Sequence, residues 1–254
     1  MRILGTQGLV RDITGHVSAR IPGTDEMFIR CRGGNERGLA YTDVHQIRRL
    51  DFNGKGGGGE SGGGKGDGLG EGFMAPLELP IHGEMYKARS EVQAVVHAHP
   101  YSAVMCGILG LVFRPIFGAF DPGGLSIAAQ GLPVYPRSVL ISRPELGQDL
   151  VGAMGARDCC LMKGHGITAV GPSVEAATLL ALRLESLASM ILEIARLGRE
   201  APSISAEDLE AFGWGATRRE SAGPRIPRSE EWNWACHVQL LKDGVGVPTD
   251  LDSD

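Results

Sequence analysis

Three histidines have the residue type and spacing of metal ligands. His97 and His99 stand two positions apart within Val95-Val96-His97-Ala98-His99-Pro100. Because side chains on one face of a β-strand recur every second residue, both imidazoles would point to the same side. His165 lies between two glycines, which let the chain turn tightly and approach a site closely. Three neutral imidazoles leave a coordination position open, so we predict one catalytic divalent ion, Zn, Mn, Co or Fe, held by these three residues.

The same histidines also allow a simpler interpretation. His97 and His99 could stack across a sheet, and His165 could be an ordinary turn residue. The two-residue spacing is only moderately specific, so spacing alone does not separate the two interpretations.

Glu78 and His82 form a second candidate pair. In a helix over 77–89, side chains four positions apart share a face, so both can point at one place. Glu78 could exchange a proton with a substrate once burial tunes its pKa. It could instead only complement the positive end of the helix dipole. We interpret His82 as a packed residue, or one that supports the ligands, rather than as a fourth ligand.

These candidates fall on an alternation of strands and helices. Short β-prone runs bounded by turn residues predict strands, and apolar residues at three- and four-residue spacing predict helices. The predicted strands are 26–30, 46–52, 92–98, 139–142, 159–162 and 167–170, and the predicted helices are 77–89, 101–109, 144–154 and 173–197. The last helix has the clearest apolar stripe, with Ser173 as its N-cap.

Composition divides the chain into a catalytic part and a tail. Residues 54–72 are mostly glycine and lack the apolar groups that would offset ordering entropy, so they predict a mobile loop. They also lack the pattern of a phosphate-binding loop. We predict a catalytic domain over 1–212 and a C-terminal arm over 213–254 that packs at a subunit interface.

Charge and cysteine usage limit the partners. A formal charge of −5 and a pI near 5.8 argue against binding to a nucleic-acid backbone. Five cysteines, two of them adjacent at Cys159-Cys160, do not suggest a secreted disulfide framework. No apolar run is long enough to cross a bilayer. We expect a soluble cytoplasmic protein whose partner is a small molecule.

Four motifs, in this order along the chain, resemble the class II aldolase/adducin family. Residues 15–20, Gly-His-Val-Ser-Ala-Arg, stand where the family has G-N-x-S-x-R, and Glu78 with His82 matches E-x-x-x-H. Residues 94–100, Ala-Val-Val-His-Ala-His-Pro, are similar to its A-V-V-H-x-H segment. His165-Gly166 followed by Gly171 is similar to H-G-x-x-x-x-G. The resemblance runs from about residue 5 to 198.

The resemblance implies a fold, a metal site and an assembly. The expected fold is a single three-layer α/β/α domain with a central, mainly antiparallel sheet. The two strand histidines and the later histidine would bind Zn or a similar ion, and Glu78 would be an acid/base group or an additional ligand. The family commonly forms homotetramers with active sites at subunit interfaces, so we expect the same here.

Three segments depart from the sugar-phosphate aldolases of this family, which hold a phosphate with small hydroxyl and amide groups. His16 replaces the family asparagine, Ala-Tyr-Thr-Asp at 40–43 replaces a threonine-rich turn, and Pro76-Leu77 replaces paired serines. A phosphate would find few donors. The Gly-His-Val-Ser variant, with Arg-Cys-Arg-Gly-Gly at 30–34, is instead similar to the branch that decarboxylates hydroxylated aromatic acids such as dihydroxyphthalates.

We therefore predict a metal-dependent, non-oxidative decarboxylase of an ortho-hydroxylated aromatic or heteroaromatic acid. A metal chelated by the ring hydroxyl and the neighbouring carboxylate would withdraw electron density as carbon dioxide leaves. Glu78 or His16 would supply the proton that replaces it. The side chains predicted to contact the substrate are Ser18, Arg30, Arg32 and Arg37. Guanidinium groups bind carboxylates in a forked geometry, although each arginine could equally be solvated.

Two other functions remain open from the sequence. An aldolase or dehydratase of a small hydroxy-carbonyl compound would use the same metal to stabilise an enediolate. A non-catalytic interaction module, as in the adducin branch, would use the fold for assembly. Members of that branch lack the metal ligands, which this chain retains.

Overall fold

A computed structural model of the 254-residue chain describes residues 1–34, 36–56, 72–214 and 229–245. Within them, seven strands form one sheet in the order β3-β2-β1-β4-β7-β6-β5. The strands are β1 (His16–Arg20), β2 (Glu26–Arg30), β3 (Ile47–Asp51), β4 (Ala94–Ala98), β5 (Val134–Tyr135), β6 (Cys159–Met162) and β7 (Gly166–Gly171). All neighbours run antiparallel except β5 and β6. The predicted mainly antiparallel sheet is confirmed.

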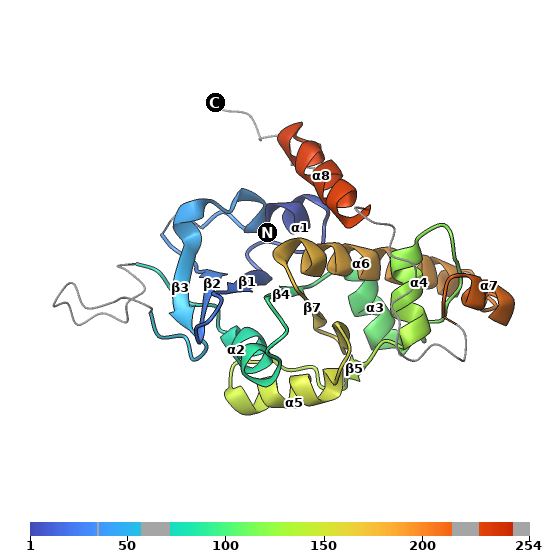
Figure 1. The fold of residues 1–254 in the computed structure, drawn as a ribbon, viewed down its shortest axis with the longest axis horizontal. Coiled ribbons are helices and arrows are strands. Elements are labelled where there is room, and N and C mark those ends of the chain that lie inside the picture. The colour runs from blue at the N-terminus through green and yellow to red at the C-terminus, as the bar shows by residue number, and fades with distance from the viewer. Residues whose placement is uncertain (35, 57–71, 215–228, 246–254) are drawn as a thin grey trace.

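Helices cover both faces of this sheet (Figure 1). One face carries α3 (Tyr101–Leu109), α4 (Pro122–Gln130) and α6 (Val174–Arg196), and the other carries α2 (Leu79–Ala88) and α5 (Pro144–Met154). The remaining described helices are α1 (Arg2–Thr6), η1 (Leu39–Tyr41), η2 (Val44–Gln46), α7 (Ala206–Ala211) and α8 (Ser229–Lys242). The expected three-layer α/β/α architecture is therefore present.

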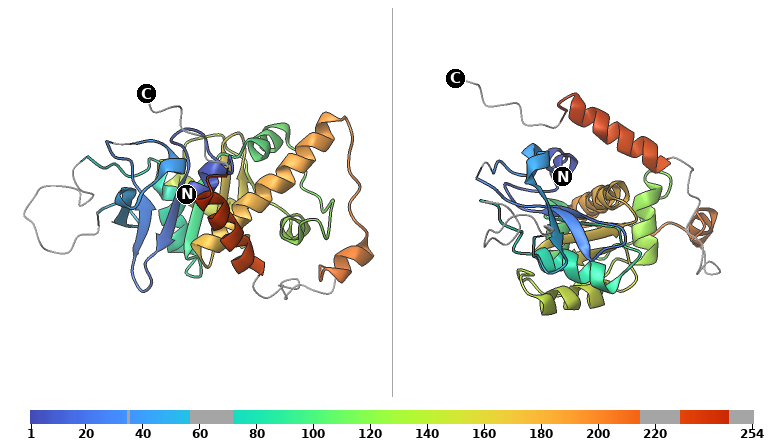
Figure 2. Two further views of the ribbon diagram at one scale, coloured as in Figure 1. Left: turned by 90° about the horizontal axis from the view of Figure 1, so that it is seen from above. Right: turned by 60° about the vertical axis from the view of Figure 1, so that its left-hand side comes forward.

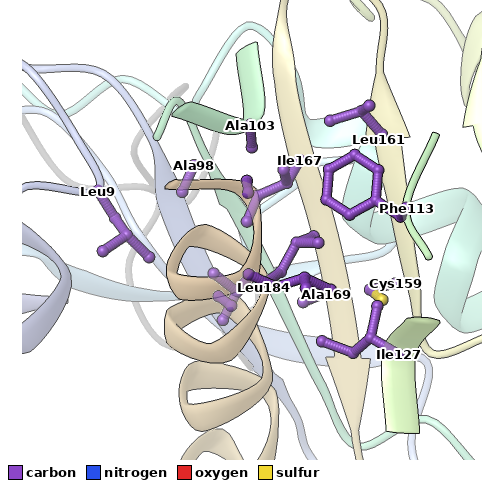
Figure 3. Packing of buried hydrophobic residues seen from close by; sticks show 14 of the residues in the cluster. Leu9, Ala98, Ala103, Phe113, Ile127, Cys159, Leu161, Ile167, Ala169 and Leu184 are labelled. Carbon is purple, nitrogen blue, oxygen red and sulfur yellow. The ribbon is translucent and has the colours of Figure 1, made fainter. Parts of the chain in front are cut away.

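Each face of the sheet has its own apolar core. On the α6 face, Leu184 and Ile127 lie over Ala169 of β7 (Figure 3). On the α2 face, Met85 and Leu150 pack with residues of the same sheet. The central strand β4 is buried along its whole length because its side chains alternate between the two cores.

Strand register places two histidines side by side. His16 of β1 is paired with His97 of β4, and His97 is paired in turn with Thr168 of β7. Directly paired residues of antiparallel strands point to the same face. Both imidazoles therefore lie on the α2 face of the sheet, where the N-terminus of α2 meets them.

Local sequence accounts for several element ends. The Ser173 hydroxyl accepts a hydrogen bond from the Ala176 amide at 3.1 Å and caps α6, as predicted. Helix α5 begins at Pro144, a residue suited to the first helical turn. The predicted bounds of α3, α5 and β6 are confirmed.

Three expectations about local structure were wrong or incomplete. Residues 139–142 are not a strand, because the Ile141 amide donates to a Glu78 carboxylate oxygen at 2.9 Å instead of to a neighbouring strand. His16 begins β1, a strand that is absent from the predicted set. Helix α4 was missed because Gly123 and Gly124 weaken its sequence signal, although Asp121 caps it.

The two segments set apart by composition lie partly outside the described residues. Of the predicted mobile loop 54–72, residues 57–71 are outside them, as are 215–228 and 246–254 of the predicted arm 213–254. Helix α8 within that arm packs against α6 and α1 (Figure 2). The described helices lack the combination of length and apolar character that a bilayer crossing needs.

Two separate glycine-to-alanine variants test how closely α2 packs against the backbone beneath it. A Cβ atom at Gly83 would lie 2.0 Å from the backbone oxygen of Phe52, whereas one at Gly152 of α5 would meet nothing within 4 Å. Alanine at Gly152 should raise the free energy of unfolding by about 0.5–1 kcal/mol through helix propensity. Gly83→Ala should lower it by about 1–3 kcal/mol, because overpacking outweighs that gain. Urea unfolding measures both, and a stabilised Gly83→Ala protein would contradict this seating of α2.

Candidate metal centre

Four side chains from separate parts of the chain converge on the α2 face of the sheet. Glu78 precedes α2, His97 lies within β4, His99 follows that strand, and His165 precedes β7. Their potential ligand atoms all lie within 4.8 Å of one another. The structure therefore brings together the three predicted ligands and the predicted carboxylate.

The separations between these atoms suit a shared ion. His97 Nε2 lies 2.9 Å from His99 Nε2 and 3.3 Å from Glu78 Oε2, and His165 Nε2 lies 3.2 Å from Glu78 Oε1. Metal bonds of about 2.0–2.2 Å place neighbouring ligand atoms about 2.8–3.6 Å apart, for ligand–metal–ligand angles of about 90–109°. Three imidazoles and a carboxylate form a donor set that accepts Zn²⁺ and other first-row divalent ions.

Hydrogen bonds outside the cluster orient its members. His97 Nδ1 lies 3.0 Å from the Ile167 carbonyl oxygen, and a carbonyl only accepts, so Nδ1 carries the proton. The Nε2 atom of His97 is then left with a lone pair directed at the cluster. On the other side, the Ile141 amide donates to Glu78 Oε1 at 2.9 Å and holds the carboxylate in place.

Close backbone approach brings His99 and His165 together. Gly166, which follows His165, has no side chain to keep β7 away from β4. A Cβ atom there would lie 2.3 Å from the Ala98 carbonyl oxygen and 2.8 Å from Cδ2 of His99. The glycine next to His165 is therefore required by close packing of two strands, in addition to any need for a turn.

The surroundings favour the unprotonated forms that metal ligands need. Burial raises the pKa of Glu78, but hydrogen bonds and charge from His165 and His97 outweigh it and lower the pKa well below the ordinary value. Burial, followed by the charges of His97 and His165, lowers the pKa of His99 to about 3. The carboxylate is thus ionised and the imidazole neutral near pH 7.

A second, buried hydrogen-bonded group lies beside the cluster. The His16 ring is centred 4.9 Å from the His97 ring, and His16 Nδ1 lies 2.6 Å from His82 Nε2. The Ser18 hydroxyl lies 2.6 Å from His82 Nδ1 and 2.7 Å from the Tyr86 hydroxyl. Burial, aided by neighbouring histidines, lowers the pKa of His82 to about 3 and that of His16 well below its ordinary value.

This group shows what His82 contacts, and it contains one residue that the sequence analysis missed. His82 is fully buried and hydrogen-bonded to its neighbours, outside the four-residue cluster, in agreement with a supporting role. Tyr86 had not been singled out. Its signal was present in the sequence, because Glu78, His82 and Tyr86 follow one another at four-residue spacing on one helix.

Three of the four predicted substrate contacts, Ser18, Arg30 and Arg32, are engaged with other groups of the protein. Ser18 is only 2% exposed, and its hydroxyl already has two partners. Arg30 points to the opposite face of β2 from its neighbour Ile29, which pairs with Ser18, and it forms an ion pair with Glu36. Arg32 donates to the Ile13 carbonyl oxygen at 3.3 Å.

Comparison with known proteins gives a family and named relatives. The model of the Class II Aldolase and Adducin N-terminal domain matches residues 1–192. A 3,4-dihydroxyphthalate decarboxylase from Arthrobacter keyseri is 42% identical over 197 residues, covering 78% of this chain and 76% of that protein. An L-fuculose phosphate aldolase from Shigella flexneri is 30% identical over 205 residues, covering 80% of this chain and 83% of that one.

The fold agrees with this relationship. A crystal structure of an aldolase II superfamily protein from Pseudomonas syringae superposes with a TM-score of 0.72 at 19% identity, covering 96% of this chain and 90% of that chain. The L-fuculose 1-phosphate aldolase from Glaciozyma antarctica gives a TM-score of 0.67 at 17% identity, with 95% and 85% covered. Together with the match over residues 1–192, this shows that the chain belongs to the class II aldolase and adducin family.

Proposed function

We propose that the protein is a divalent-metal-dependent, non-oxidative decarboxylase of an ortho-hydroxylated aromatic or heteroaromatic acid, such as a dihydroxyphthalate. The observation that carries the proposal is the convergence of Glu78, His97, His99 and His165 beside a buried His16. The decarboxylase relative from Arthrobacter keyseri supports the same class of reaction. The interaction-module alternative does not need this donor set.

His97, His99 and His165 would hold the ion, with the Glu78 carboxylate beside it. A bound Zn, Mn, Co or Fe ion would supply Lewis acidity toward the hydroxyl and carboxylate oxygens of the substrate, helping the ring to accept an electron pair. The protein would orient the acid so that the bond between the ring carbon and the departing carboxylate breaks. That ring carbon then keeps the electron pair and must take up a proton.

Glu78 and His16 are the groups we assign to proton handling. The Ile141 amide holds the Glu78 carboxylate beside the three histidines, where it could exchange a proton with a substrate hydroxyl. His16 is buried next to His97, where a ring bound at the metal would lie. We therefore propose that both residues act in catalysis.

Recognition of a second substrate carboxylate is assigned to the arginines with free donors. The Arg30 guanidinium is engaged by Glu36, whereas Arg37 is exposed and lines an open pocket with Arg2 and Thr42. A guanidinium in such a pocket can bind a carboxylate with two parallel hydrogen bonds. Arg37 is therefore the favoured candidate among the predicted arginines, followed by Arg32.

We further propose a cytoplasmic homotetramer in which the arm 213–254 packs at a subunit interface. Helix α8 has no buried residue among those described, and Trp232 is 63% exposed. Large exposed aromatic side chains are favoured at interfaces. This assignment rests on the arm and on the family, not on the geometry of the metal centre.

Metal binding should depend on the clustered histidines alone. We expect about one divalent ion per subunit in the parent protein. His97→Ala and His99→Ala should each lower the metal affinity at least ten-fold, because replacing a residue that only supports a ligand already lowers it about 10–100-fold. His45→Ala removes an exposed histidine and should change nothing. Elemental analysis after dialysis measures all four proteins. Equal metal content in the parent and both cluster variants would contradict the site.

Decarboxylation should require both the metal and Glu78. We expect carbon dioxide release from at least one acid in a panel of hydroxylated aromatic acids, and its loss after chelation. Glu78→Gln should lower kcat by about 10²–10⁴, the range of general acid–base catalysis. Glu91→Gln, which alters an exposed carboxylate, is the matched control.

Two results would overturn this assignment. One is the absence of carbon dioxide release across the panel with Zn, Mn, Co and Fe. The other is cleavage of a hydroxy-carbonyl compound without decarboxylation, which would establish the aldolase alternative. Metal content of Glu78→Gln must be measured in parallel, because a lost ligand and a lost acid–base group both lower kcat.

A further inference from the structure

The hydrogen-bonded group beside the metal centre forms a continuous chain of four side chains. It runs from Tyr86 through Ser18 and His82 to His16, with donor–acceptor separations of 2.7, 2.6 and 2.6 Å. All four side chains are buried, with exposed fractions between 0 and 5%. Buried polar groups must be hydrogen-bonded, so the groups at the two ends determine which atom donates and which accepts in each hydrogen bond of the chain.

Tyr86 determines the direction in which the hydrogen bonds of this chain run from donor to acceptor. Its phenol is buried, and leaving a buried hydroxyl proton without an acceptor costs free energy. The acceptor available to it in the structure is the Ser18 oxygen. If Tyr86 donates to Ser18, the single proton of the Ser18 hydroxyl is free to go to His82 Nδ1.

The same donor-to-acceptor direction then fixes the tautomers of His82 and His16. A neutral His82 that accepts at Nδ1 has its proton on Nε2, and this proton is donated to His16 Nδ1. His16, accepting at Nδ1, has its own proton on Nε2. That nitrogen has no hydrogen-bond partner among the described residues, and the His16 ring lies beside His97.

The opposite order of donors is less favourable. If His16 donated from Nδ1, the chain would end with Ser18 donating to Tyr86, and the buried phenol would keep a proton with no acceptor in the described structure. It would also leave a lone pair on His16 Nε2. The two orders therefore predict opposite protonation of His16, and so opposite roles.

We propose that Tyr86, Ser18 and His82 form a relay that fixes the His16 proton on Nε2 and passes a replacement proton to it. This inference rests on the proposed function. As carbon dioxide leaves, the ring carbon takes the Nε2 proton of His16. At the same time His16 Nδ1 receives a proton from His82, His82 receives one from Ser18, and Ser18 receives one from Tyr86.

Arg20 offsets part of the charge left at the far end, where burial raises the pKa of Tyr86 above its ordinary value. The transfer leaves a phenolate on Tyr86, and the Arg20 guanidinium lies 4.8 Å from the centre of that ring. A further bond from Arg20 to the Tyr86 carbonyl oxygen, at 2.5 Å, holds the cation there. Water that enters after product release returns one proton along the same chain. The positioning residues are therefore Tyr86, Ser18 and His82, and His16 is the group that touches the substrate.

Nitrogen NMR of the zinc-loaded protein tests the relay without using turnover. With ¹⁵N-labelled histidine, and with the His16 signals assigned by loss in His16→Gln, we expect a protonated Nε2 and an unprotonated Nδ1. In Tyr86→Phe the fixed order is lost, and both His16 tautomers should be populated. Tyr135→Phe is the matched control, because the Tyr135 hydroxyl is also buried but has no described partner.

Kinetics give the second measurement. Tyr86→Phe and Ser18→Ala should each lower kcat by about 10–10², a part of the general-acid contribution, with unchanged KM and metal content. A His16 protonated on Nδ1 in the parent protein would overturn the relay, as would a Tyr86→Phe protein with the parent tautomer and kcat. A parent protein that shows the expected tautomer but decarboxylates no acid would instead overturn the proposed function.

Discussion

The structure depends on one electrostatic constraint, which is that donor atoms of three imidazoles and one carboxylate lie within 4.8 Å of one another in a largely buried place. His97 is fully buried and Glu78 is 6% exposed, so water cannot screen them effectively. The His97 Nδ1 proton is committed to a carbonyl, which leaves Nε2 of His97 2.9 Å from Nε2 of His99. A proton or a cation must lie between such groups, and a divalent ion is the cation that this donor set prefers.

A few elements of the fold, β1, β4 and α2, position most of the residues of the site. The pairing of β1 with β4 places His16 next to His97, and helix α2 supplies Glu78, His82 and Tyr86 from successive turns of one face. The carboxylate side of the metal centre and the buried chain behind His16 are therefore fixed by the same helix. A shift of α2 would alter both together, which links metal binding to proton supply. The close contact between Gly83 and the Phe52 backbone helps to fix the position of α2.

Much of the site could be predicted from the sequence, because its signals are local. The two-residue spacing of His97 and His99 determines a shared face of a strand, and the four-residue spacing from Glu78 determines a shared face of a helix. The features that the sequence analysis missed are long-range. The Ile141 amide binds Glu78 across 63 positions of sequence, which removes a predicted strand. The use of Ser18 by a buried chain, rather than by a substrate, depends on where α2 packs on β1. Periodicity describes one element at a time, so it cannot give such contacts.

The most direct test of the account is an anomalous-diffraction map of crystals grown with Zn²⁺ or Mn²⁺. The account predicts one strong peak per subunit within about 2.0–2.2 Å of the Nε2 atoms of His97, His99 and His165, with Glu78 adjacent. It also predicts that at least one coordination position faces an open space large enough for an oxygen ligand. A peak at other residues, or an ion enclosed by four protein ligands with no open position, would contradict the central claim.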